Sequence, residues 1–317
     1  MRNIGGELEL KFSNVESYFT DSGRSSLRFF LRTSINKNKK YLLPDFFCEV
    51  IERIFIDENI EYSFYKIDNK LLFDERELLN KDFDVLYVIN YFGMQTSIES
   101  SVLKNKIIIE DNVFFHNFEN VLKYKHWFAF NSFRKVSQLS GGSLIKTNLD
   151  LDEDLISNKN APFVKVKNVA KNIKNEYLNN KLFTEQEYLD KLKEAEDDLD
   201  KQKNIFNIDN GLISNLISMD INIQQIIRKR RFEILYSLFP QECINKKPSY
   251  YSFFILLVKN RNKLREKLMR DNIYLPIHWP KSSVSNELYN KIISIPLFEI
   301  YTEQEFLYLI EKIKGAL

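Results

Sequence analysis

The sequence predicts an α/β fold, in which a large domain with a mainly parallel sheet flanked by helices precedes a small α+β domain at the C-terminal end. In the first half of the chain, short apolar runs alternate with polar stretches of helix length. Within each run the apolar residues are continuous, which is typical of strands buried on both faces of a parallel sheet. From about residue 165 the chain becomes charged and helical, and a mixed pattern returns towards its end.

The individual elements follow in order along the chain. A first helix is expected at 24–35, where Leu27, Phe30 and Leu31 have helical spacing. Strands are expected at 41–43, 62–65, 85–89, 107–109, 127–130, 143–145 and 252–258. The further helices are expected at 46–54, within 165–205, and at 212–238, 261–271 and 302–314. We place the large domain at residues 1–205 and the small domain at residues 206–317.

Composition excludes several classes of protein. The 317 residues, 44% of them hydrophobic, suffice for a full core. A net charge of +2 gives no overall field that attracts nucleic acid, and no apolar run reaches the roughly 18 residues of a membrane span. Two cysteines and three histidines form neither a disulfide framework nor a metal-binding pattern. Because no secretory signal begins the chain, we expect a cytoplasmic protein. Because the cysteines and histidines form no metal-binding pattern, we expect it to lack a metal.

Three polar segments are candidates for a binding site, because ligands of open parallel sheets bind at the carboxyl ends of strands. The first is residues 21–26, at the start of the predicted helix 24–35. Its N–H groups and the hydroxyls of Ser22 and Ser25 would suit an anion, with Gly23 allowing close approach and Arg24 adding a charge. The same residues would also serve as a plain helix cap, so both interpretations stay open.

The second segment is Glu110-Asp111, directly after the apolar run 107–109. A buried carboxylate is costly unless a partner neutralises it, and a protonated pyridine nitrogen would be such a partner. The alternative is an acidic residue in a surface loop or a helix cap.

The third segment is residues 131–135, after the predicted strand 127–130. A lysine that forms a Schiff base must lose its proton easily, and burial beside another cation such as Arg134 would lower the pKa of Lys135. Ser132 could donate a hydrogen bond to a phosphate. The alternative is a pair of solvated basic residues in a loop.

The order of these segments resembles that of the DegT/DnrJ-type sugar aminotransferases, and in particular a shortened branch in which Ser-Phe-Arg-Lys replaces Ser-Phe-His-x-x-Lys. The matching motifs, in order, are Ser22-Gly23, Pro44 after a strand, Tyr91-Phe92-Gly93, Glu110-Asp111, Ser132-Phe133-Arg134-Lys135 and Gly141-Gly142. The resemblance continues in residues 260–265, 277–280 and 295–297. It therefore covers the chain from about residue 16 to its end.

The resemblance implies the aspartate-aminotransferase type of fold and a homodimer whose subunits share active sites. It implies pyridoxal 5'-phosphate (PLP) as cofactor, with Lys135 forming the Schiff base and moving the proton, and with Asp111 paired to the pyridine nitrogen. The phosphate would be held by Ser22, Gly23, Arg24, Ser25 and Ser132, and Phe46 or Phe47 would cover the ring. Substrate contacts would come from Asn90, His278 and Trp279. The implied reaction moves an amino group from an amino acid, usually glutamate, to a nucleotide-linked keto-sugar for surface polysaccharide or other amino-sugar products.

The sequence also departs from the family pattern. Arg24 stands where Thr is common, Phe114 where His or Gln is usual, Asn90 where His is usual, and Ser140 precedes Gly141-Gly142 without the usual acid. Two alternatives follow from these departures. One is a PLP enzyme with a different outcome, such as sugar dehydration, although dehydratase relatives usually carry His in place of the lysine. The other is a non-catalytic homologue that acts as a scaffold or partner.

Overall fold

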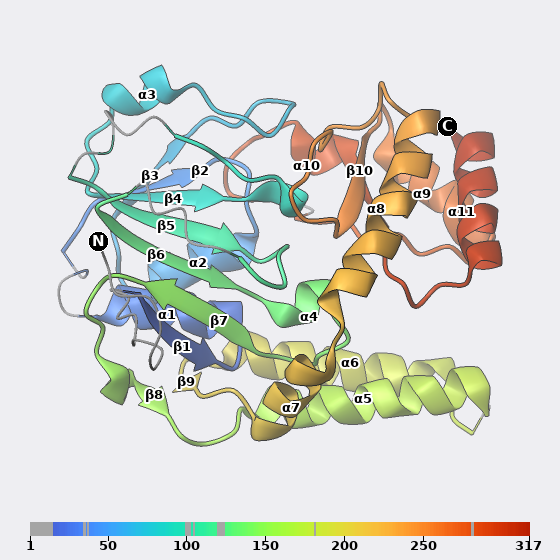
Figure 1. Cartoon of the computed structure of the whole chain (residues 1–317), viewed down its shortest axis with the longest axis horizontal. Coiled ribbons are helices and arrows are strands. Elements are labelled where there is room, and N and C mark those ends of the chain that lie inside the picture. Colours follow the sequence, from blue (N-terminus) through green and yellow to red (C-terminus); the bar gives the residue numbers. More distant parts are fainter. Residues whose placement is uncertain are drawn as a thin grey trace, which may run out of the picture.

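A seven-stranded sheet forms the centre of the computed structural model, which describes residues 15–33, 36, 38–98, 103, 105–118, 124–180, 182–279 and 282–317. The strand order is β1-β7-β6-β5-β4-β2-β3, and within the described residues all neighbouring strands are parallel except the pairs that β7 makes (Figure 1). Its strands are β1 (Glu16–Thr20), β2 (Tyr41–Pro44), β3 (Tyr62–Tyr65), β4 (Val85–Ile89), β5 (Ile107–Asn112), β6 (His126–Asn131) and β7 (Ser143–Thr147). The predicted mainly parallel sheet is thus confirmed.

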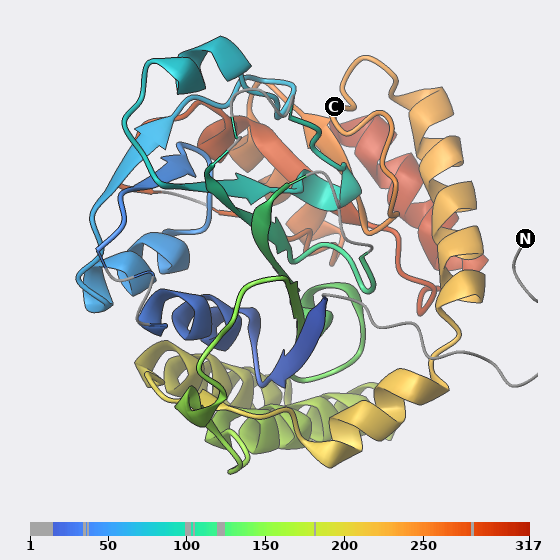
Figure 2. The ribbon, with the colours of Figure 1, turned by 60° about the vertical axis from the view of Figure 1, so that its left-hand side comes forward.

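Helices and short elements surround this sheet. They are α1 (Gly23–Arg32), α2 (Glu49–Asp57), α3 (Glu75–Leu79), α4 (Phe133–Val136), α5 (Pro162–Asn179), α6 (Glu185–Lys201), the 3₁₀ turns η2 (Tyr91–Gly93) and η3 (Glu153–Leu155), and a two-stranded pair of β8 (Ile156–Ser157) with β9 (Ile205–Phe206). Helix α1 packs against α2, β6 and β7, and α5 and α6 lie side by side below α1 (Figure 2).

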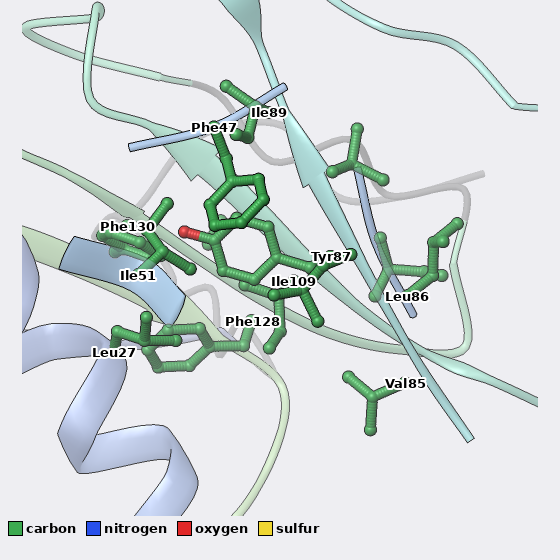
Figure 3. Close-up of a cluster of buried hydrophobic side chains, with 14 of the residues drawn as sticks. Leu27, Phe47, Ile51, Val85, Leu86, Tyr87, Ile89, Ile109, Phe128 and Phe130 are labelled. Carbon is green, nitrogen blue, oxygen red and sulfur yellow. The ribbon is translucent and has the colours of Figure 1, made fainter. Parts of the chain in front are cut away.

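The core of the sheet explains why its apolar runs are continuous. All five residues of β4 are buried, on both faces of the strand. Figure 3 shows Val85, Leu86, Tyr87 and Ile89 of this strand within one hydrophobic cluster. A fully buried aliphatic or aromatic side chain stabilises a fold by about 1.5–3 kcal/mol. Such burial favours a strand at the middle of the sheet over any exposed arrangement of this segment.

The C-terminal part has a hydrophobic cluster of its own, between a two-stranded antiparallel sheet and three helices. The elements of the whole C-terminal part are α7 (Asn210–Ser218), α8 (Ile221–Leu238), β10 (Phe253–Leu257), α9 (Arg261–Arg270), α10 (Leu288–Lys291), β11 (Ile292–Pro296) and α11 (Glu303–Ala316). This agrees with the predicted small α+β unit. The first cluster also includes Phe253 and Trp279, so packing joins the two parts, and the boundary between residues 205 and 206 stays a prediction. No helix in the described ranges combines the length and apolar character needed to cross a membrane.

Several predicted elements differ from those observed. The expected helix at 212–238 is two helices, α7 and α8, because Asp220 caps the second by accepting a hydrogen bond from the N–H of Ile223. The helix expected at 46–54 begins only at Glu49. The strand expected at 107–109 continues to Asn112, so Glu110 and Asp111 belong to it. Strands β1 and β11 were not predicted as strands.

The turn before β7 depends on a glycine. Gly142 has a φ of +90°, and its carbonyl accepts a hydrogen bond from the N–H of Phe133 at 3.0 Å. A Cβ at this position would lie 2.8 Å from Cδ1 of Ile208. Because a non-glycine residue with such a φ is strained, we expect Gly142→Ala to lower the free energy of unfolding by about 1–3 kcal/mol, measured by chemical denaturation.

Gly315→Ala is the matched control for this variant. Gly315 lies in α11, where a Cβ would meet no atom within 4 Å apart from its chain neighbours and the nearby backbone of its own helix. Alanine there should be neutral or should stabilise the helix by up to about 1 kcal/mol. Equal stability of the Gly142→Ala variant and the unmodified chain would contradict the proposed strain.

Candidate active site

A cavity of about 350 Å³ opens at the edge of the sheet where β1, β5 and β6 end. These three strands run in the same direction, so the segments that follow them come together at this edge. The sequence-predicted site residues that line the cavity are Ser22, Gly23, Arg24, Asp111, Ser132, Lys135 and Trp279. Residues separated by more than 250 positions in the sequence therefore share one cavity.

Lys135 lies on the short helix α4 directly after β6, and it is half-buried. Burial and the adjacent positive charge of Arg134 lower the pKa of Lys135 to about 8. Its ammonium forms no hydrogen bond or ion pair with any residue that the structure describes. A lysine in this condition can lose its proton near neutral pH and act as a nucleophile.

Asp111 is buried near the end of β5, and both of its carboxyl oxygens accept hydrogen bonds. The Tyr87 hydroxyl donates to Oδ2 at 2.7 Å, and the N–H of Val113 donates to Oδ1 at 3.0 Å. Burial raises the pKa of Asp111 to about 6, while these two donors and the charge of Lys135 act in the opposite direction. The carboxyl group is therefore mostly ionised at neutral pH and held in one orientation. The alternative of an acidic residue in a surface loop is wrong for Asp111.

The start of α1 and the start of α4 form the polar end of the cavity. Ser22 caps α1, since its Oγ accepts a hydrogen bond from the N–H of Ser25 at 3.2 Å, as the capping interpretation predicts. The first N–H groups of a helix have no partner within it, so those of Gly23 and Arg24 remain available to an anion. A Cβ on Gly23 would lie 3.1 Å from the carbonyl oxygen of Asn131, so glycine allows α1 to approach the end of β6 closely.

Ser132 completes this polar end. Its side chain is buried, makes no capping hydrogen bond to α4 and has no hydrogen-bond partner in the part of the chain described. Ser25 is buried beside Ser22 and does not itself line the cavity. The arrangement of hydroxyls, N–H groups and Arg24 suits an anion.

Acidic residues of α6 cover this end of the cavity. Glu196 Oε1 accepts a hydrogen bond from Arg134 Nη1 at 3.0 Å, and Asp200 pairs with Arg24. In the sequence, residues 194–201 form an acidic run that is typical of a solvated helix face. Glu196 and Asp200 are 41% exposed, and they also neutralise Arg134 and Arg24 at the polar end of the cavity.

The aromatic residues expected over the cofactor ring lie elsewhere. Phe46 and Phe47 are fully buried and do not line the cavity. Phe46 packs on Tyr91 and Trp279, and Phe47 stacks on Phe64. Cys48, which follows them, reaches the cavity together with apolar residues of α2, Val50, Ile51 and Ile54.

The three residues expected to contact substrate are brought together only in part. Trp279 lines the cavity, with a positive φ of 60°. His278 is buried behind it, where its Nδ1 lies 2.7 Å from the Ser294 hydroxyl and burial lowers its pKa to about 3. Asn90 is buried outside the cavity, and its Nδ2 donates to Oδ1 of Asn112 at 2.7 Å. Pro280, which follows Trp279 in the matching motif, lies outside the described residues.

Phe114 and Ser140 also lie away from the cavity. Phe114 is fully buried against the rings of Phe92, His278 and Trp279. Ser140 is buried in the turn before β7. Neither residue borders the cavity that contains Lys135 and Asp111.

Sequence reasoning missed the cavity roles of Tyr87, Cys48, Glu196 and Asp200. Tyr87 lay inside an apolar run, where a tyrosine is an ordinary core residue. A buried tyrosine needs a hydrogen-bond partner, and this requirement was the one available signal. The two acidic residues are four positions apart on a helix, a spacing that places them on one face but does not identify what that face contacts.

Neither family models nor the sequences of curated proteins match this chain. A DegT DnrJ EryC1 StrS aminotransferase from Brucella abortus superimposes with a TM-score of 0.63 and 14% identity, covering 94% of this chain and 85% of that one. A protein from Streptococcus pneumoniae, assigned as a sugar aminotransferase and solved in its PLP form, gives a TM-score of 0.63 at 12% identity, with 95% and 86% covered.

The similarity extends to a second kind of aminotransferase. The histidinol-phosphate aminotransferase from Clostridium acetobutylicum has a TM-score of 0.55 at 14% identity and covers 96% of this chain and 84% of its own. The TM-score of the Brucella protein is higher, in agreement with the motif order found in the sequence. Together with the mainly parallel sheet and the edge at which the cavity opens, these superpositions show that the chain has the fold of the DegT/DnrJ-type sugar aminotransferases, as the order of its motifs predicted.

Proposed function

We propose that this chain is a PLP-dependent aminotransferase that moves an amino group from glutamate to a nucleotide-linked keto-sugar. The observation that carries the proposal is the presence, in one cavity, of a lysine amine and a fixed carboxylate together with an anion-binding end. A PLP molecule offers an aldehyde, a pyridine nitrogen and a phosphate, and each of these groups has a chemical counterpart in the cavity.

The residues present fit this cofactor. The Ser132 hydroxyl and the Lys135 amine face the cavity without a partner among the described residues, as expected of groups that bind a ligand. Ser132, Gly23 and Arg24 would hold the phosphate, and Asp111 would pair with the pyridine nitrogen. When bound, PLP supplies an electron sink that stabilises negative charge on the α-carbon of an amino acid.

The protein's own groups then have defined tasks. With its pKa near 8, Lys135 is unprotonated in a useful fraction of molecules at neutral pH, so its Nζ can hold the cofactor and afterwards accept and return a proton. The ionised Asp111 would keep the pyridine nitrogen protonated, because a buried carboxylate is stabilised by a positive charge beside it. Tyr87 fixes the orientation of Asp111 through its hydroxyl.

The finer parts of the proposal come from the family resemblance. We infer a homodimer in which both subunits contribute to each active site, and we place the protein in the cytoplasm, in a pathway to surface polysaccharide or another amino-sugar product. Support for a sugar substrate is the likeness to the aminotransferases from Brucella abortus and Streptococcus pneumoniae. Asn90, His278 and Trp279 remain the proposed substrate residues, and Trp279 is the one among them that lines the cavity.

An absorbance measurement tests the proposal. We expect the purified protein to develop the absorption band of lysine-bound PLP when PLP is added, and to lose this band when glutamate follows. A nucleotide-linked keto-sugar should then restore the band, because it removes the amino group. A band that glutamate leaves unchanged would contradict the donor and favour a PLP enzyme of different outcome. A protein that develops no band would contradict the proposal as a whole and favour a non-catalytic homologue.

A further inference from the structure

Helix α6 places two carboxylates against the two arginines of the cavity. Glu196 and Asp200 are four residues apart, so they lie on one face of the helix. The first pairs with Arg134 and the second with Arg24. Both carboxylates come from a segment more than 60 residues away from their partners along the chain.

The charge of Glu196 is permanent at any physiological pH. Burial raises its pKa, but Arg134 and Lys167 outweigh this effect and lower the pKa of Glu196 to about 2. Lys167, on α5, also forms an ion pair with it. Asp200 is in turn shared between Arg24 and Arg53 of α2, whose Nη1 lies 3.4 Å from its Oδ2. The two arginines of the cavity are therefore already paired before any ligand arrives, whereas Lys135 is not.

A phosphate group at the polar end of the cavity would compete with these carboxylates. A phosphate monoester carries close to two negative charges near neutral pH. It would be attracted by Arg24, Arg134 and Lys135, which all line the cavity, and repelled by Glu196, which lines it too. Each carboxylate that already accepts a hydrogen bond from a guanidinium weakens the attraction between that guanidinium and the phosphate.

We propose that Glu196 and Asp200 are fixed counter-ions that weaken phosphate binding in this cavity and so set how tightly the cofactor is held, with Arg134 acting beside Arg24 as a cation for the phosphate. The inference rests on the proposed function, because it takes the anion of this cavity to be the phosphate of PLP. It predicts a cofactor that dissociates more readily than the number of cations suggests. A purely structural role, in which the carboxylates hold the arginines ready for the phosphate, predicts the opposite change when they are removed.

The test compares Glu196→Gln and Asp200→Asn with the unmodified chain. Both substitutions keep the size of the side chain and its ability to accept a hydrogen bond while removing the charge. Binding of inorganic phosphate and of PLP is measured by isothermal titration calorimetry, and pyridoxal, which lacks the phosphate, serves as the ligand control. We expect each variant to bind phosphate and PLP about two- to fivefold more tightly, as is typical of charges that are partly exposed, and the binding of pyridoxal to change less than that of PLP.

Glu194→Gln is the matched control variant. Glu194 lies on the same helix and pairs with Lys191, and its side chain does not line the cavity. The Glu194→Gln substitution removes the same charge, so an effect of net charge alone would appear in this variant as well. A second readout is the pKa of Lys135, which the charge of Glu196 raises and which should therefore fall in Glu196→Gln. Circular dichroism establishes whether each variant is folded. If one of them is not, the other variant alone carries the test.

The inference is overturned if both variants bind phosphate as weakly as the unmodified chain or more weakly, or if the unmodified chain does not bind phosphate. Its failure is separable from that of the proposed function, because inorganic phosphate binding needs no reaction at Lys135. A protein that binds phosphate with the expected trend but never forms the band of lysine-bound PLP would retain the counter-ion role and lose the aminotransferase. A protein that forms the band, but whose variants do not bind phosphate more tightly, would retain the aminotransferase and lose the counter-ion role.

Discussion

Replacing Lys135 with alanine should abolish both the absorption band of lysine-bound PLP and the transfer of the amino group. The variant loses the amine that holds the cofactor and the group that moves the proton, and nothing else described in the cavity can take over both tasks. Removal of a catalytic nucleophile typically lowers turnover by several orders of magnitude, so we expect a loss of at least about a thousandfold. Turnover is measured with glutamate and a nucleotide-linked keto-sugar, and the band by absorbance.

Lys171→Ala is the control for this experiment. The pKa of Lys171 is also lowered to about 8, by burial and by the charge of Lys167, but its ammonium donates to backbone carbonyls, including that of Leu139 at 3.0 Å. It does not line the cavity. We expect this variant to keep the band and most of the turnover. Transamination that persists in Lys135→Ala would rule out the assignment of Lys135.

Replacing Asp111 with asparagine should leave PLP bound but slow the reaction by about a hundredfold or more. The asparagine side chain is neutral, so it no longer keeps the pyridine nitrogen protonated, and the electron sink is weakened. Tyr87→Phe should have a smaller effect of the same kind, because it removes the hydroxyl that donates to Asp111 at 2.7 Å and leaves the carboxyl group itself. Single-turnover measurements with glutamate separate this change from a change in cofactor affinity.

Glu110→Gln is the matched control, because Glu110 is the neighbouring buried carboxyl group of the same strand. Successive residues of a strand point to opposite faces, and Glu110 does not line the cavity. Burial raises the pKa of Glu110 to about 7, so the group is already partly neutral at neutral pH. We expect near-normal turnover. Equal turnover in Asp111→Asn and the unmodified chain would show that Asp111 is not the partner of the pyridine nitrogen.

Strands rich in apolar and aromatic residues could be predicted from the sequence, whereas strands of mixed polarity could not. The strands 62–65 and 85–89 were predicted with the bounds observed. Strand β1 lies at the edge of the sheet and exposes its first residues, so the chain carries no apolar run there. The break between α7 and α8 at Met219 and Asp220 contains neither glycine nor proline, and it depends on the cap that Asp220 provides.

For the site, sequence order identified the residues that belong to motifs. Lys135, Asp111, Ser132, Gly23 and Arg24 follow strands or begin helices, where parallel topology brings them to one edge. The expectation for Phe46 and Phe47 assumed that an aromatic residue in that segment faces the cavity. In the structure both rings turn into the core, because Tyr91, Trp279 and Phe64 offer them aromatic partners.

The sequence by itself determined the parallel sheet, the edge at which a ligand would bind, and the lysine and aspartate at that edge, because these features follow from local runs and from the order of elements. Only the tertiary structure decided which charges surround them. Arg24 and Asp200 are 176 residues apart in sequence, and Arg134 and Glu196 are 62 apart. Ion pairs of this kind leave no local pattern, since each partner alone resembles a solvated surface charge. Their pairing depends on how α6 packs, and the electrostatic field of the cavity depends on this pairing.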